Sequence, residues 1–251
     1  MQEATSFLRY VLPGLISIVE FLGYILISGD PSPGRIGEWT KDTGLVAGAF
    51  LASAALGALW GVIYYQVVDC IDRLKINYSL PFEEAQSRKW VKLECYRQGR
   101  ELQGTKLTEK GAWRVGGSYF STRAEVSKSI KGADRRMNRF ADLVHGLGAT
   151  WVGSFMALVF FLIVNISRAW PSHQVSGRAL LSLVTAVVIL ILHFCNFMRV
   201  KKECEIVYRM ILLEEFEIRY EKKKEPIRFY VSQDDLKREK NKSQSTCQES
   251  S

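Results

Sequence analysis

The chain has 251 residues, of which 47% are hydrophobic and 24% charged, and its formal net charge is +8. These averages resemble those of soluble proteins, but the charges are segregated. Asp, Glu, Lys and Arg are absent from 43–68, 143–167 and 179–198, and 7–28 carries only Arg9 and Glu20. Such segregation excludes a plain soluble globule, a mostly disordered chain and a disulfide-stapled fold.

Four apolar stretches are long enough to cross a bilayer as helices, because a hydrocarbon core of about 30 Å needs roughly 20 helical residues. We predict transmembrane helices at about 7–28, 43–68, 145–166 and 179–198. Glu20 weakens the first by roughly 2.5–3.5 kcal/mol, which its large apolar residues offset. The expected fold class is an all-α polytopic membrane protein with four transmembrane helices, helical extensions and a small, mostly α cytoplasmic domain that could contain a short β element.

Lys and Arg are unevenly distributed outside the apolar stretches. Segment 69–142 carries sixteen of them and the tail after Met198 thirteen, whereas the loops 29–42 and 168–178 carry two each. Basic segments stay in the cytoplasm. We therefore expect an integral protein of the inner or plasma membrane, with both termini and segment 69–142 cytoplasmic.

The chain divides into five predicted parts. They are a transmembrane hairpin (1–68), a cytoplasmic insert (69–142), a second hairpin (143–198), a cytoplasmic helical extension (199–231) and a disordered tail (232–251). In the insert, glycines between Thr105 and Ser121 predict turns, which leaves room for a two-stranded element there. The tail has almost no apolar residue, a composition typical of disorder.

Glu20 is the sharpest single candidate for function, because charged groups inside a bilayer face a bundle interior or water. A count of helical rise, at about 1.5 Å per residue, places no Lys, Arg or His at its depth. The groups near its level are the hydroxyls of Ser53, Ser154 and Thr185. These four residues are the predicted intramembrane polar or pore set. In a symmetric oligomer Glu20 could form an acidic ring that favours cations. Alternatively, it is protonated and hydrogen-bonded to a neighbouring helix.

Small residues recur every fourth position in the second span, a spacing that lets helix backbones approach closely. The predicted packing residues are Gly44, Gly48 and Ala52 on one face, Gly57 and Gly61 on another, and Gly153 on the third span. Two such faces suit packing within the chain or a contact between subunits. We expect a homo-oligomer.

Basic clusters flank the predicted spans. They are Arg73 and Lys75; Arg135, Arg136 and Arg139; and Arg199, Lys201 and Lys202. Each charge near an anionic leaflet contributes about 1 kcal/mol, so we expect these side chains to face lipid headgroups.

Motifs of enzyme chemistry are absent from the sequence. There is no phosphate loop, no dinucleotide fingerprint and no H-E-x-x-H, and the three histidines do not have zinc-ligand spacing. We therefore expect no catalytic residue, metal or cofactor, and a protein that is not an enzyme. The basic stretch from Arg88 to Arg100 is explained by solvation of a helix face, so we expect no nucleic-acid partner.

Two classes of function remain open. The first is a non-enzymatic membrane anchor or signal transducer whose cytoplasmic domain binds a soluble partner or ligand at the bilayer. The second is an oligomeric ion channel or membrane-permeabilising effector, gated by that domain. The large share of the chain outside the spans and the absence of enzyme motifs favour the first, and Glu20 with the small-residue faces favours the second.

Overall fold

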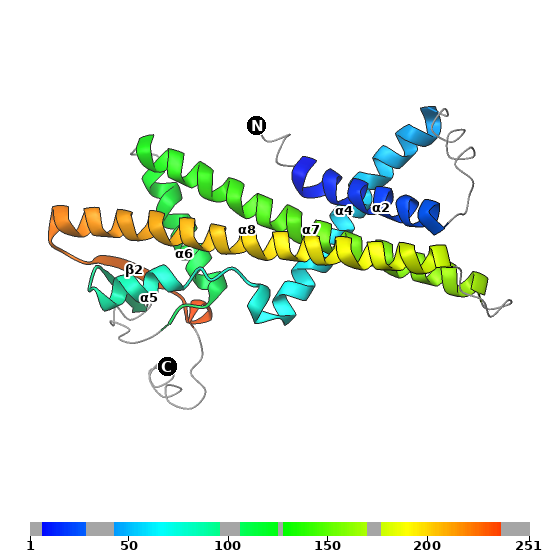
Figure 1. Ribbon diagram of the computed structural model, residues 1–251. Coiled ribbons are helices and arrows are strands. Elements are labelled where there is room, and N and C mark those ends of the chain that lie inside the picture. The colour runs from blue at the N-terminus through cyan, green and yellow to red at the C-terminus, as the bar shows by residue number, and fades with distance from the viewer. Residues whose placement is uncertain (1–6, 29–42, 96–105, 125–127, 170–176, 237–251) are drawn as a thin grey trace, which may run out of the picture. The chain divides into compact units, whose positions relative to one another are not determined.

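The structure is a computed structural model, which describes residues 7–28, 43–95, 106–124, 128–169 and 177–236. Helices dominate it, with one small pair of strands (Figure 1). The chain forms two compact units. The first unit comprises Met1–Lys75 and Asn138–Glu203, and the second comprises Ile76–Met137 and Cys204–Ser251.

The prediction of four helices that are long and apolar enough to cross a bilayer is confirmed. The apolar helical segments are Arg9–Ser28, Ala47–Cys70, Arg136–Ser167 and Gly177–Lys223. They belong to η1 (Phe7–Val11) with α2 (Leu12–Ser28), α4 (Thr43–Cys70), α7 (Lys128–Ala169) and α8 (Gly177–Lys223). Residues 7–11 form a π-helical turn. Pro13, which has no amide donor for the carbonyl of Arg9, lies just beyond this wider turn.

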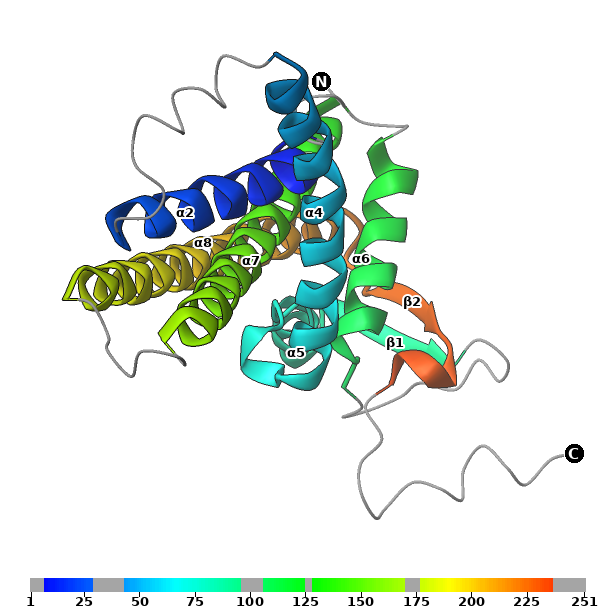
Figure 2. The ribbon, with the colours of Figure 1, turned by 90° about the vertical axis from the view of Figure 1, so that its right-hand side faces the viewer.

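In the first unit, α2 and α4 cross with their backbones in contact (Figure 2). A Cβ atom on Gly14 would overlap the carbonyl oxygen of Ser53, and one on Gly57 would overlap that of Tyr10. The crossing therefore requires glycine on both helices. Small residues serve this purpose in membranes, where close van der Waals packing replaces the hydrophobic drive between helices.

Helix α7 packs against the same crossing. A Cβ on Gly153 would lie 3.0 Å from the Trp60 ring, and one on Gly148 would overlap the ring of Tyr64. The indole Nε1 of Trp60 donates a hydrogen bond of 3.0 Å to the hydroxyl of Ser17. Buried polar groups need such partners even more in lipid than in water.

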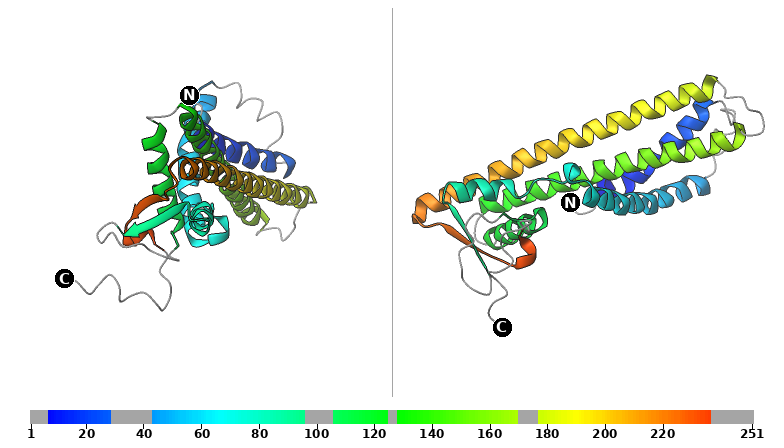
Figure 3. Two further views of the ribbon diagram at one scale, coloured as in Figure 1. Left: turned by 90° about the vertical axis from the view of Figure 1, so that its left-hand side faces the viewer. Right: turned by 90° about the horizontal axis from the view of Figure 1, so that it is seen from below.

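The second unit contains the strands β1 (Val91–Cys95) and β2 (Ile227–Val231), which pair in parallel with Val91 opposite Ile227 (Figure 3). Its helices are α5 (Leu80–Ser87), α6 (Glu109–Ala124) and the ends of α7 and α8. The short 3-10 turn η2 (Asp72–Leu74) precedes this unit, and η3 (Gln233–Asp235) follows β2. Ile227, Phe229 and Val231 are buried and the residues between them exposed, the alternation of a half-buried strand.

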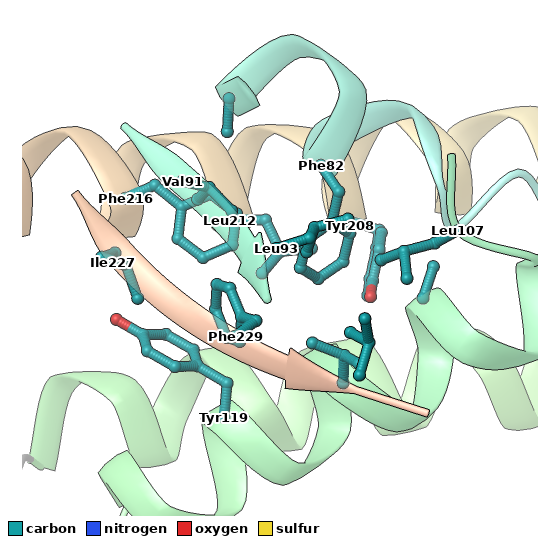
Figure 4. Close-up of a cluster of buried hydrophobic side chains, with 14 of the residues drawn as sticks. Phe82, Val91, Leu93, Leu107, Tyr119, Tyr208, Leu212, Phe216, Ile227 and Phe229 are labelled. Atoms are coloured by element: carbon teal, nitrogen blue, oxygen red, sulfur yellow. The ribbon is translucent and has the colours of Figure 1, made fainter. Parts of the chain in front are cut away.

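An aromatic core fills the second unit (Figure 4). Phe216 of α8 is fully buried and lies 5.6 Å from the ring centroid of Phe82 and 5.8 Å from that of Phe229. Tyr119 of α6 completes the group at 5.7 Å from Phe216. Tilted and edge-to-face pairs at these distances are the preferred arrangement of aromatic rings.

The predicted position of the β element, between Thr105 and Ser121, is wrong. Residues Glu109–Ala124 form α6, and the strands come from Val91–Cys95 and Ile227–Val231. The three glycines that suggested turns, Gly111, Gly116 and Gly117, lie inside α6. The missing Cβ of Gly116 leaves room for the hydroxyl of Tyr208.

The end of the predicted helical extension also differs. Helix α8 ends at Lys223, and 227–231 is a strand rather than a helix. Residues 232–236, expected to be disordered, are folded: the Asp235 carboxylate accepts hydrogen bonds from the amide (3.2 Å) and hydroxyl (2.7 Å) of Ser232. Asp235 also lies 3.0 Å from Arg114. The remainder of the predicted tail, 237–251, is outside the described residues.

Gly111→Ala is expected to destabilise the second unit by about 1–3 kcal/mol, the usual cost of overpacking. A Cβ there would meet the backbone of Asp235, with its Cα at 2.8 Å. Gly117→Ala on the same helix is the matched control, because no atom lies within 4 Å of its added Cβ. Denaturant unfolding of both variants checks this. Equal stability of the two would contradict the packing of η3 on α6.

Tyr119 makes the second unit sensitive to alkaline pH. Burial raises the pKa of its phenol above the ordinary value of 10.0, although the hydrogen bond from Arg219 opposes this. The folded state therefore holds this proton more tightly than the unfolded state, and the stabilisation is lost as pH rises through the folded pKa. We expect the free energy of unfolding to fall above about pH 10, and to fall less steeply in Tyr119→Phe. Denaturation at several alkaline pH values tests this, with Tyr230→Phe as the exposed control.

Candidate functional site

A polar cluster inside the first unit joins α2 to α8. The carboxylate of Glu20 lies 2.8 Å from Nε2 of His193 and accepts a hydrogen bond of 3.3 Å from the hydroxyl of Tyr24. The Glu20 side chain is 9% exposed and that of His193 25%. In the described part of the chain, these are the hydrogen-bond partners of Glu20.

The expectation that no His lies at the depth of Glu20 is wrong. It rested on the heights of backbone atoms, whereas side chains on a helix lean toward its N-terminus. Helices α2 and α8 each contribute to the first unit, and the backbone of Tyr24 meets the hydroxyl of Ser182 at 2.7 Å. The two helices run in opposite directions (Figure 1), so Glu20 and His193 lean toward each other. Their side chains therefore meet although their backbone positions differ in depth by several residues of helical rise.

The hydroxyls predicted to share the site with Glu20 have other partners. Ser53 donates to the carbonyl of Phe50 at 2.6 Å, Ser154 to that of Thr150 at 3.1 Å, and Thr185 to that of Leu181 at 2.9 Å. Each is thus satisfied by its own helix. Ser53 and Ser154 are buried, whereas Thr185 is partly exposed.

The predicted packing residues divide into two groups. Gly57 and Gly153 lie in close helix contacts, but the added Cβ atoms at Gly48 and Gly61 would meet no atom within 4 Å, and Ala52 is exposed. The surroundings of Gly44 are outside what the structure describes. The face with Gly57 therefore packs within the chain, while that of Gly48 and Ala52 does not.

Among the predicted lipid-facing basic residues, Arg73, Arg136, Arg139, Arg199 and Lys202 are exposed and Lys75 is half-buried. Lys201 is an exception, since it is only 8% exposed. It follows Phe197 by one helical turn and so falls on the buried face of α8. The side chain of Arg135 is outside the described residues.

A second polar cluster in the first unit lies at the start of the η1 and α2 segment. The Arg9 guanidinium is 3.3 Å from Asp142 of α7 and donates a hydrogen bond to the hydroxyl of Tyr65 of α4. The ring of His145 lies 4.9 Å from that of Tyr65, centroid to centroid. This cluster joins three helices. The carboxylate partner of Arg9 is therefore Asp142 and not Glu20.

The Glu20 carboxylate and the His193 imidazole can share one proton through their 2.8 Å contact. Among the described residues, no three His, Cys, Asp or Glu side chains come together as a metal site. Glu20 was found from the sequence but was not paired with His193 or Tyr24. The signal for Tyr24 was its spacing of one helical turn from Glu20; His193 had no signal beyond its presence in an apolar helix.

Comparison of the chain with family models, with characterised proteins and with solved structures finds no match in any of the three.

Proposed function

We propose that the chain is a non-enzymatic integral membrane signal transducer. In this proposal the first unit lies in the bilayer, and the second unit binds a soluble partner or ligand on the cytoplasmic side. The excess of Lys and Arg in 69–142 and after Met198 supports this orientation. The four long apolar helices support residence in the membrane.

The observation that carries the proposal is the continuity of α8. It is one helix from Gly177 to Lys223, which supplies His193 to the polar cluster and Phe216 to the aromatic core of the second unit (Figure 3). An uninterrupted helix moves as a rigid element, and rigid elements with two arrangements carry coupling between distant sites. A change at His193 would therefore be felt at Phe216.

The polar groups of the first unit favour a transducer over a pore. Glu20 is bonded to His193 and Tyr24, and the hydroxyls of Ser53 and Ser154 are bonded to their own helices. A cation pathway would need such oxygens to be open to water. Here they are committed to partners inside one copy of the chain.

Hydrogen exchange on the full protein in lipid nanodiscs tests the transducer. We expect Glu20→Gln, which keeps the shape of the side chain, to change the exchange of the β1 and β2 amides several-fold, at constant pH, relative to the unaltered protein. Val19→Ala is the matched control, because Val19 neighbours Glu20 but is 60% exposed. Identical exchange in all three proteins would contradict the proposal.

Ion flux into liposomes tests the competing channel function. The proposal predicts that the purified protein carries no more current than empty liposomes. A current that Glu20→Gln abolishes and Val19→Ala preserves would overturn it in favour of a pore.

A further inference from the structure

We propose that the pair formed by Glu20 and His193 is a proton-binding site, and that uptake of a second proton from water is the signal that the transducer senses. The inference rests on the proposed function, because it names the input of that same site. It is carried by three features: the 2.8 Å contact between the two groups, their partial burial among the apolar helices, and their position as a link between α2 and α8.

With one proton shared between them, Glu20 and His193 together carry no net charge. The proton can reside on Nε2 of His193 or on the carboxyl group, and either arrangement preserves the hydrogen bond between them. A second proton from water converts the pair to an imidazolium and a neutral carboxyl, with a net charge of +1. No covalent bond other than the new N–H or O–H bond forms or breaks.

The extra charge weakens the link between the two side chains. The imidazolium loses its anionic partner, and with it the attraction between opposite charges across the 2.8 Å contact. An unpaired cation inside the bilayer is also costly. His193 is the more exposed of the two, at 25% against 9%, so the cost is relieved when its side chain moves out of the unit and away from Glu20.

Other titratable groups in the first unit do not compensate the added charge. Beside Tyr24 they include Arg9, Tyr10, Tyr64, Tyr65, Asp69, Cys70, Arg73, Lys75, Arg139, Asp142, His145, Arg178, Cys195, Arg199, Lys201, Lys202 and Glu203. Within the described residues, none of these is hydrogen-bonded or ion-paired to Glu20 or His193. Asp142, an anion of the same unit, is already held by Arg9 at 3.3 Å.

The pair is well placed to control the position of α8. Glu20 is the only charged residue of α2, so within the described residues its contact with His193 is the only ion pair between α2 and α8. At a second point, the hydroxyl of Ser182 in α8 donates a 2.7 Å hydrogen bond to the carbonyl of Tyr24 in α2. Loss of the pair therefore frees α8 on the side of His193 while Ser182 stays attached.

Spin-label distance measurements in nanodiscs test the proton site. Labels at Val19→Cys and Leu192→Cys, on a background without native cysteines, report the separation of α2 and α8 beside the pair; both positions are at least 60% exposed. Between about pH 8 and about pH 5, where histidine ordinarily titrates, we expect the mean distance to change by about 1–2 Å, the usual size of a helix shift. In Glu20→Gln and in His193→Gln the distance should not change with pH.

Hydrogen exchange of the β1 and β2 amides in the same samples distinguishes a failure of the proton site from a failure of the transducer. If the distance in the unaltered protein is the same at both pH values, or if both variants shift as it does, the proton site is refuted. The transducer survives that result if Glu20→Gln still alters exchange in the second unit. If the distance changes with pH only in the unaltered protein and exchange does not follow, the proton site stands and the transducer is refuted.

Discussion

Replacing Phe216 with alanine is expected to lower the free energy of unfolding of the second unit by about 3–5 kcal/mol, the usual cost of removing a fully buried ring. The ring is fully buried and contacts Phe82, Tyr119 and Phe229. Its loss leaves a cavity on which α5, α6 and β2 border, so the surrounding helices cannot collapse into it without giving up their own contacts. Hydrogen exchange of the β1 and β2 amides, measured with increasing denaturant, gives the value.

Ile218→Ala is the matched control for this prediction. It removes an apolar side chain of the same helix, but one that is 54% exposed, and such surface substitutions stay within about 0.5 kcal/mol. A loss of less than about 1 kcal/mol in Phe216→Ala would show that the ring cluster is not the core of the unit.

Gly57→Ala is expected to destabilise the first unit by about 3 kcal/mol, the upper end of the range for overpacking. Its new Cβ would overlap the carbonyl oxygen of Tyr10, which is backbone and cannot rotate away. The helices α2 and α4 must then separate, which also strains the hydrogen bond between Trp60 and Ser17. Thermal unfolding in detergent, followed by tryptophan fluorescence, measures the effect.

The control for Gly57→Ala lies one turn further along α4. No atom lies within 4 Å of a Cβ added at Gly61, so Gly61→Ala should stabilise the helix by up to about 1 kcal/mol through its better helix propensity. The two substitutions are chemically identical. Their effects on stability differ in sign only because Gly57 lies at the crossing with η1 and α2 and Gly61 does not. A Gly57→Ala protein as stable as Gly61→Ala would contradict that crossing.

The four apolar helices could be predicted from sequence because crossing a bilayer requires an uninterrupted apolar length, which is a local property of the chain. Gly57 was predictable for a similar reason, since small residues at intervals of four mark close approach. Its partner Gly14 was not, because the residues four positions away on either side, Tyr10 and Ile18, are large.

The strands could not be placed because their pairing is non-local. Val91 pairs with Ile227, which lies 136 residues further along the chain, and a parallel pair has no hairpin turn that would reveal it in the sequence. Alternation of apolar residues at 91, 93 and 95, and at 227, 229 and 231, was a usable signal. The basic stretch from Arg88 to Arg100 was interpreted as a helix face instead, whereas Val91–Cys95 within it is a strand.

The partner of Glu20 was missed for a geometric reason. Depth along two helices can be counted from sequence, but the tilt of each helix and the lean of each side chain come only from packing. The same limit applies to Lys201, whose charge predicted contact with lipid headgroups while its place on α8 buries it.

The most direct test of the central claim interrupts α8 between the two units, at the junction of Glu203 and Cys204. Inserting three glycines there should break the rigid helix, whereas inserting three alanines adds the same length and keeps it helical. We predict that Glu20→Gln still changes hydrogen exchange of β1 and β2 in the alanine-inserted protein, and no longer does so in the glycine-inserted protein. An undiminished effect of Glu20→Gln across the glycine insertion would contradict signalling through α8.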